Sequence, residues 1–126
     1  MNKVINTTNA PAPIGPYSQA VMANGFLFLS GQVAINPESG EVVESSVVEE
    51  THQVMRNIKS VLLEASYEFK DVVKTTIFLT DMSLFSEVNE VYGSYFEDNF
   101  PARETVAVKG LPKNVNVEIS MTAYKG

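Results

Sequence analysis

The sequence predicts an α+β fold that forms one domain over residues 1–126, with two helices on one face of a mixed sheet. Three observations support this prediction. Two segments carry apolar residues at helical spacing, and several shorter segments carry the β-branched and aromatic residues typical of strands. The order along the chain is three strands, a helix, a strand, a helix and two strands, without a linker. The chain is long enough to bury one core but not two.

The first quarter of the chain predicts three strands. Lys3–Ile5 forms a short one, and the proline-rich segment Asn9–Pro16 follows as a loop without regular structure. Residues 18–23 and 26–32 then form a strand pair, because the Asn24-Gly25 dipeptide between two apolar runs is typical of a hairpin turn.

The first helix is predicted from a capping box. Ser46 and Glu49 have the required spacing, and the apolar residues that follow indicate a helix to about Ser66. Residues 71–80 are rich in β-branched residues and predict a central strand.

The second helix is predicted to begin at a cap formed by Asp81 or Ser83 and to end near Asn99. Its apolar side contains Leu84, Phe85, Val88, Val91, Tyr92, Tyr95 and Phe96. Two strands close the chain, the first after Pro101 and the second from Val115 to Tyr124.

Residues 26–29, Phe-Leu-Phe-Leu, are apolar on both faces of their strand. Two helices on one side of a sheet cover only one of its faces. We therefore expect another copy of the chain to cover the other face.

A candidate site lies in the last quarter of the chain. Arg103 and Thr105 alternate with their neighbours and project from one face, and Glu118 lies on the polar face of the last strand. If these strands are neighbours, the arginine and the glutamate point into one cleft. The pattern alone favours the alternative, an ordinary cross-strand ion pair.

Ser30 and Gly31 interrupt the third strand. The glycine indicates either a bulge or a place where the backbone approaches a ligand closely, because no Cβ stands in the way. Both readings stay open from the residues alone.

The composition argues against several classes of function. The net charge is −6 and no run of basic residues occurs, so a surface for the nucleic-acid backbone is not expected. The chain has no cysteine and a single histidine, His52, which leaves neither a disulfide nor a typical metal site. No apolar run approaches the ~20 residues of a membrane span, and we expect a cytoplasmic protein.

The remaining inventory suits a small anionic substrate. The planar fork of an arginine matches a carboxylate, and a glutamate can deprotonate a water that attacks an electrophilic carbon. Neither an electron sink nor an activated covalent nucleophile is evident. Hydrolysis of a substrate that is already reactive is the chemistry these residues support.

Three motifs, in order, resemble the signatures of the reactive-intermediate deaminase family (the RidA or YjgF family). They are Ile14-Gly15-Pro16-Tyr17-Ser18-Gln19-Ala20, Ser30-Gly31-Gln32, and Phe100-Pro101-Ala102-Arg103 followed by Leu111-Pro112-Lys113 and Val117-Glu118-Ile119. The resemblance extends from about residue 2 to residue 125. It implies a chorismate-mutase-like fold assembled as a homotrimer, with a cleft between each pair of subunits.

The resemblance also implies an activity. Members of the family hydrolyse 2-imino acids, such as 2-iminobutanoate and 2-iminopropanoate, to 2-keto acids and ammonia without a cofactor. Carried onto this chain, Arg103 binds the substrate carboxylate and Glu118 activates the water. The resemblance further implies that the substrate-binding residues are Tyr17, Ser30, Gly31, Asn89 and the backbone of Thr105.

The chain departs from the family pattern at two positions. Many relatives have a cysteine where this chain has Thr105, so this chain lacks that thiol. Many also have a second glutamate where this chain has Ser120, so the last strand of this chain is less acidic. Two functions of other classes are alternatives: a sensor of keto or amino acids without turnover, and a chaperone-like or ribonuclease activity. The charge balance and the lack of a His-His or His-Lys pair disfavour the ribonuclease.

Overall fold

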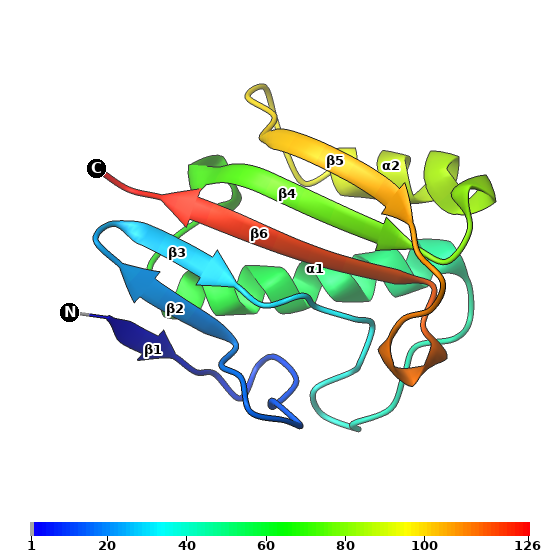
Figure 1. Ribbon diagram of the computed structural model, residues 1–126, viewed down its shortest axis with the longest axis horizontal. Coiled ribbons are helices and arrows are strands. Elements are labelled where there is room, and N and C mark those ends of the chain that lie inside the picture. The colour runs from blue at the N-terminus through cyan, green and yellow to red at the C-terminus, as the bar shows by residue number, and fades with distance from the viewer. Residues whose placement is uncertain (1) are drawn as a thin grey trace.

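The computed structural model describes residues 2–126 and contains one six-stranded sheet, in the strand order β1-β2-β3-β6-β4-β5 (Figure 1). The sheet is mixed, as predicted: β4 and β5 are parallel, and every other pair is antiparallel. The strands are β1 (Lys3–Ile5), β2 (Ala20–Ala23), β3 (Phe26–Leu29), β4 (Val72–Leu79), β5 (Ala102–Ala107) and β6 (Val117–Tyr124).

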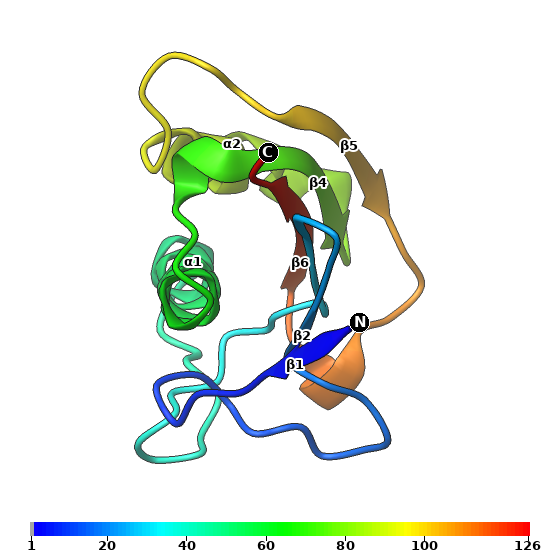
Figure 2. The same cartoon turned by 90° about the vertical axis from the view of Figure 1, so that its left-hand side faces the viewer.

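Both helices, α1 (Val47–Glu64) and α2 (Phe85–Gly93), cover the same face of the sheet (Figure 2). The predicted start of α1 is confirmed, because the Ser46 side chain accepts a hydrogen bond from the Glu49 amide at 3.1 Å. α2 connects the parallel strands β4 and β5, which cannot be joined by a tight turn. This crossover carries β5 to the outer edge of the sheet.

The core lies between the sheet and the helices. Alternate residues of β6, namely Val117, Ile119, Met121 and Ala123, are buried, as the alternating pattern predicted. The side of α1 that faces them contributes Val54, Met55, Ile58, Val61 and Leu62. One face of the sheet is therefore a closed hydrophobic layer.

The predicted hairpin is confirmed, and its strands are shorter than expected. Asn24 and Gly25 form the turn with φ angles of 52° and 87°. β3 ends at Leu29 because the backbone leaves the regular ladder at Ser30, and only Gln32 returns to form a single bridge with Ile119. The interruption read from Ser30-Gly31 is therefore real.

The predicted end of the second helix near Asn99 is wrong. α2 ends at Gly93, and the next residues form tight turns in which Tyr95 N–H bonds Tyr92 O and Phe96 N–H bonds Gly93 O. The Ser94 hydroxyl also donates to Val91 O at 2.6 Å. Apolar spacing continued past the helix because Phe96 still reaches the core from this turn.

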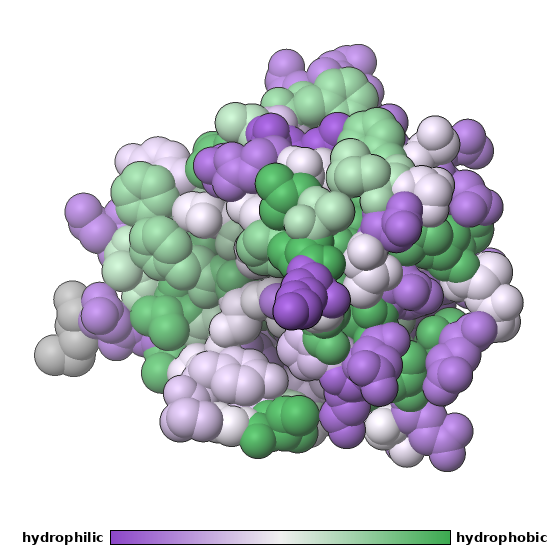
Figure 3. Space-filling view, turned by 45° about the vertical axis from the view of Figure 1, so that its right-hand side comes forward, coloured by the Kyte–Doolittle hydropathy of each residue, from purple (hydrophilic) through white to green (hydrophobic). Residues whose placement is uncertain are grey.

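The other face of the sheet carries apolar side chains that nothing in this chain covers. Figure 3 shows apolar surface there, interrupted by polar groups. The residues with large exposed side chains on this open face are Val4, Phe26, Phe28, Val106 and Tyr124. Within one chain, the prediction that both faces of β3 are covered holds only for the helix side, where Leu27 and Leu29 are buried.

Candidate active site

Arg103 lies on the helix side of β5. Its register partner in β4 is Thr75, which is fully buried beneath the helices. The guanidinium Nη1 donates to Oδ1 of Asn89 on α2 at 2.7 Å. Arg103 and Asn89, each of which the family resemblance placed in the site, thus lie together, and the Asn89 side chain orients an exposed arginine.

Thr105 points to the same side as Arg103, because its register partner is the buried Ile77. Its hydroxyl is buried and makes no hydrogen bond to any residue that the structure describes. We call Asn89, Arg103 and Thr105 the arginine half-site.

Glu118 lies on the open face of the sheet. Its register partner in β4 is Phe78, one position away from the residues that face the helices. Burial raises the pKa of its carboxyl group above the ordinary value of 4.5. A carboxylate with a raised pKa is a stronger base than that of an ordinary surface glutamate.

Gly31 lies directly against Glu118. A Cβ on Gly31 would overlap Oε2 of Glu118 and approach its Cδ to 2.7 Å and its Cγ to 2.9 Å. The bend at Ser30-Gly31 and its bridge to β6 therefore place a bare backbone beside the carboxylate. The side chain of Glu118 alone is enough to require a glycine at position 31, independently of any ligand.

Ser30 and Tyr17 belong to the same region as Gly31. The Ser30 hydroxyl donates to Ser18 O at 2.5 Å, and its amide donates to Gln19 O, which ties the bend to the segment that carries Tyr17. The Tyr17 side chain is half exposed. We call Tyr17, Ser30, Gly31 and Glu118 the glutamate half-site.

Buried Gln19 anchors the loop before Tyr17. Its amide donates to the carbonyls of Thr7, Ala10 and Pro11, and its Oε1 accepts from the Thr7 amide at 2.7 Å. This glutamine orders a proline-rich loop that has no regular structure of its own.

The two half-sites do not meet within one chain. The expectation that Arg103 and Glu118 lie on neighbouring strands is wrong, because β4 lies between β5 and β6. The two side chains also leave opposite faces of the sheet. The alternative of a cross-strand ion pair is wrong as well, since the described residues form only the ion pairs Lys70–Glu68 and Lys74–Glu104.

A hollow of about 490 Å³ opens beside Arg103, with Asn89, Tyr92, Gly93, Phe100 and Pro101 as its other lining residues. The rings of Phe85 and Tyr92 also flank the guanidinium. Sequence reasoning assigned Phe85 and Tyr92 only to the apolar side of the helix. Their spacing from Asn89, four residues before and three after, places all three on one helix face and is the signal that could have found them.

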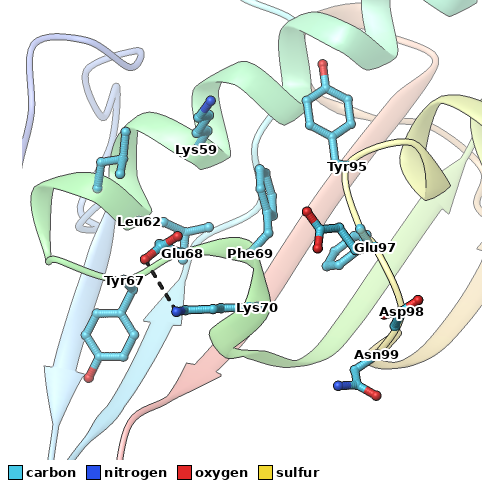
Figure 4. A pocket seen from close by; sticks show the side chains of 12 residues that line it. Lys59, Leu62, Tyr67, Glu68, Phe69, Lys70, Tyr95, Glu97, Asp98 and Asn99 are labelled. Atoms are coloured by element: carbon cyan, nitrogen blue, oxygen red, sulfur yellow. Dashed lines mark ion pairs between the residues drawn. The ribbon is translucent and has the colours of Figure 1, made fainter.

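A second hollow, of about 500 Å³, lies between the end of α1 and the segment after α2 (Figure 4). Its lining includes Phe69, Tyr95 and Phe96, with Glu97 and Asp98 at its rim, and none of the predicted site residues. Residues 2–126 contain no group of three metal-ligating side chains close enough to hold an ion. Neither helix described here has the length and apolar character needed to cross a membrane.

Comparisons with known proteins agree with the sequence motifs. The family model described as Endoribonuclease L-PSP matches residues 7–125. A RutC family protein from Pyrococcus horikoshii is 50% identical over 125 residues, covering 99% of each chain. The 2-iminobutanoate/2-iminopropanoate deaminase of Mus musculus is 47% identical over 126 residues, which is 100% of this chain and 93% of that protein.

A solved structure extends the agreement to the fold. YyfA from Yersinia pestis, described as a protein of the conserved Rid family, superimposes with a TM-score of 0.97 at 48% identity and covers 99% of this chain and 100% of that chain. The matched segments include every residue of both half-sites. The chain belongs to the reactive-intermediate deaminase (RidA/YjgF) family.

Proposed function

We propose that the protein hydrolyses 2-imino acids, including 2-iminobutanoate and 2-iminopropanoate, to 2-keto acids and ammonia. A single observation carries the proposal. The Arg103 guanidinium is exposed and oriented by Asn89, and no carboxylate among the described residues neutralises it. An arginine held in this way is suited to a carboxylate brought by a substrate. The 47% identity to a deaminase that acts on these imino acids supports the same substrate class.

In the proposed reaction Arg103 binds the substrate carboxylate, and Asn89 holds the arginine in place. Glu118 takes a proton from water as the oxygen attacks the imine carbon. That proton passes to the substrate nitrogen and gives an amino alcohol. Glu118 then takes the proton of the new hydroxyl group and delivers it to the same nitrogen, so the carbon–nitrogen bond breaks, the carbonyl forms and ammonia leaves. The raised pKa of the Glu118 carboxyl makes the carboxylate a stronger base for taking the proton from water. Tyr17, Ser30, Gly31 and the backbone of Thr105 line the substrate site.

The proposed site needs two copies of the chain. Arg103 and Glu118 leave opposite faces of the sheet, so one substrate can contact both only if they come from different subunits. The exposed apolar side chains on the open face give a second copy a surface to cover. We propose a homotrimer with a site between each pair of subunits.

Three further features belong to the proposal. The reaction needs neither a metal nor an organic cofactor, because water is the only co-reactant. The partner is a small molecule rather than nucleic acid, in keeping with the net charge of −6. We also propose that the protein acts in the cytoplasm.

A turnover assay tests the proposal and separates an enzyme from a sensor that binds without reaction. The imine is generated in situ from the parent amino acid by an oxidase, and keto-acid formation is compared with the spontaneous rate. We expect saturable acceleration that survives exhaustive chelation, and its loss in Arg103→Ala. A protein that binds 2-ketobutyrate but leaves the spontaneous rate unchanged would be a sensor.

A further inference from the structure

Two aromatic rings of α2 flank the arginine half-site. The guanidinium carbon of Arg103 lies 5.7 Å from the ring centroid of Phe85 and 5.2 Å from that of Tyr92. Together with Asn89, these residues occupy positions i, i+4 and i+7 of the helix, so they share one face. We propose that Phe85 and Tyr92 are positioning residues that hold the Arg103 guanidinium ready for the substrate carboxylate. This inference rests on the proposed function.

The physical need for such support is clear from the place of Arg103. The side chain is exposed at the sheet edge, and a free arginine there samples many rotamers that must be given up when it binds a ligand. A guanidinium within 6 Å of an aromatic ring centroid is attracted to the ring by its quadrupole. Asn89 engages only one nitrogen, Nη1, which leaves donors of the fork for a bidentate contact with a carboxylate.

Tyr92 is itself fixed from below. Its hydroxyl donates to Oγ1 of Thr75 at 3.0 Å, and both residues are buried. Thr75 is also the register partner of Arg103, so one position of β4 locates the tyrosine ring and the base of the arginine together. Burial raises the pKa of the Tyr92 hydroxyl above the ordinary 10.0, and this hydroxyl is protonated at neutral pH as that of any tyrosine is. A Tyr92 ring anchored in this way restrains the position and orientation of the Arg103 guanidinium beside it.

The chain offers a matched control in Tyr67. This tyrosine is also buried, its hydroxyl donates to Gly25 O at 2.8 Å, and its ring lies 5.4 Å from Nζ of Lys125. It has the same kinds of contact as Tyr92 but belongs to neither half-site. Tyr67→Leu therefore measures the general cost of losing a buried tyrosine with a cationic neighbour.

The test compares Tyr92→Leu, Tyr92→Phe, Phe85→Leu and Tyr67→Leu. An exposed cation–π contact corresponds to about a two- to fivefold change in affinity. We expect Tyr92→Leu and Phe85→Leu each to raise KM for the imine, and the Kd for 2-ketobutyrate, by about this factor, with kcat nearly unchanged. Tyr92→Phe, which keeps the ring, should recover most of the affinity. Tyr67→Leu should match the parent in both constants.

A spectroscopic readout separates positioning from a loss of stability. The chain has only two arginines, Arg56 and Arg103, so their Nε–Hε signals are resolved and Arg56 serves as an internal reference. The ring current should displace the Arg103 signal in the parent and in Tyr92→Phe, and the displacement should shrink in Tyr92→Leu and Phe85→Leu. This measurement needs no turnover, so it also stands if the protein proves not to be a deaminase.

Two results would overturn the inference. One is an Arg103 signal that is the same in all four variants. The other is an affinity for 2-ketobutyrate in Tyr92→Leu and Phe85→Leu equal to that of Tyr67→Leu. If Tyr92→Leu fails to fold, Phe85→Leu decides alone, since Phe85 is only partly buried at the first turn of α2.

Discussion

Gly31 shows most directly how a single residue shapes the candidate site. The space that a Cβ would take at this position is filled by the Glu118 carboxylate. We expect Gly31→Ala to push the carboxylate out of place and lower kcat/KM by about a hundredfold, because displacements near 1 Å have costs of this order. Steady-state kinetics on the imine checks the expectation.

Gly110 provides the matched control for this substitution. A Cβ there meets no atom within 4 Å, and its backbone does not require a positive φ. Gly110→Ala should therefore retain the parent activity. Equal activity in Gly31→Ala would mean that Glu118 has room to move without consequence.

Glu118 predicts a distinctive pH dependence. Burial raises the pKa of its carboxyl group, and the proposed reaction requires the ionised form as the base. Activity should therefore fall on the acid side of neutrality around a pKa above the ordinary 4.5, and the kcat/KM profile measures this limb.

The same shift has the opposite sign for stability. Because folding disfavours the charged carboxylate, the stabilising contribution of Glu118 is complete below the unfolded pKa and is lost as the pH rises through the raised folded pKa. Glu118→Gln should be more stable than the parent at pH 7 and should lose this advantage below about pH 4. Urea titrations at both pH values test the sign, and an advantage that persists in acid would contradict it.

Five of the site residues, Arg103 and Glu118 among them, were recognisable because they lie in the quoted motifs, whereas the residues that support them carry no such mark. Glu118 and Arg103 follow from residue type and from the family resemblance. Tyr92 and Phe85 read as ordinary core residues, since an aromatic residue at helical spacing has no mark that it faces a cation. Only the parallel register of β4 and β5 brings Arg103 above them.

At the scale of elements, one buried carboxylate ties the start of α1 to the start of β6. Glu50, in the first turn of α1, accepts hydrogen bonds from the amides of Asn116 and Val117 at 2.7 and 3.2 Å and from the Asn116 side chain at 3.0 Å. Asn116 and Val117 lie where β6 begins. The glutamate thus fixes the entry of the strand that carries Glu118.

We expect Glu50→Ala to lower the free energy of unfolding by about 3 kcal/mol, because it leaves buried amide donors without an acceptor. Urea denaturation measures the loss. Glu90→Ala, at an exposed position of α2, is the control and should stay within about 0.5 kcal/mol of the parent. A loss in Glu50→Ala no larger than in the control would mean that water satisfies both amides.

The existence of each element could be predicted from the sequence, but its neighbours could not. The Ser46 cap and the Asn24-Gly25 turn are local signals, and both predicted elements are present. Strand order is set by packing between distant segments, so no local sequence pattern indicates that β4 inserts between β5 and β6. Without the strand order, the sequence led to the wrong expectation that Arg103 and Glu118 point into one cleft of a single chain.

At the scale of the whole molecule, the open face of the sheet points to self-association. Phe28 lies on this face with 48% of its surface exposed, beside other large apolar side chains. A charge placed there would have to be buried when a second copy packs against the face. We expect Phe28→Glu to dissociate the proposed trimer. Imine hydrolysis should be lost with it, because the arginine half-site and the glutamate half-site of different subunits then separate.

Light scattering measures this dissociation. The parent should have three times the 13.8 kDa mass of one chain, and Phe28→Glu should have the mass of one chain. Leu63→Glu is the control, since Leu63 is 55% exposed on α1, on the helix side of the molecule. A parent protein with the mass of a single chain at micromolar concentration would remove the shared site.

The apolar residues on both faces of β3 predicted that the helices leave one face of the sheet uncovered. They contain no information on how many subunits pack together to cover that face. That number depends on the shape and twist of the open face, which the order of apolar and polar residues does not encode. The trimer therefore comes from the family resemblance and stays a prediction.

The central claim is that Arg103 of one subunit and Glu118 of another act on one substrate. Mixing two inactive variants tests it most directly. Arg103→Ala and Glu118→Gln are unfolded, mixed in equal amounts and refolded, alongside each variant refolded alone. In random trimers, about one quarter of the shared sites regain both residues.

We therefore predict that the mixture recovers about a quarter of the parent activity while each variant alone stays inactive. Mixed trimers that form, as mass spectrometry shows, and yet remain inactive would contradict a site shared between subunits.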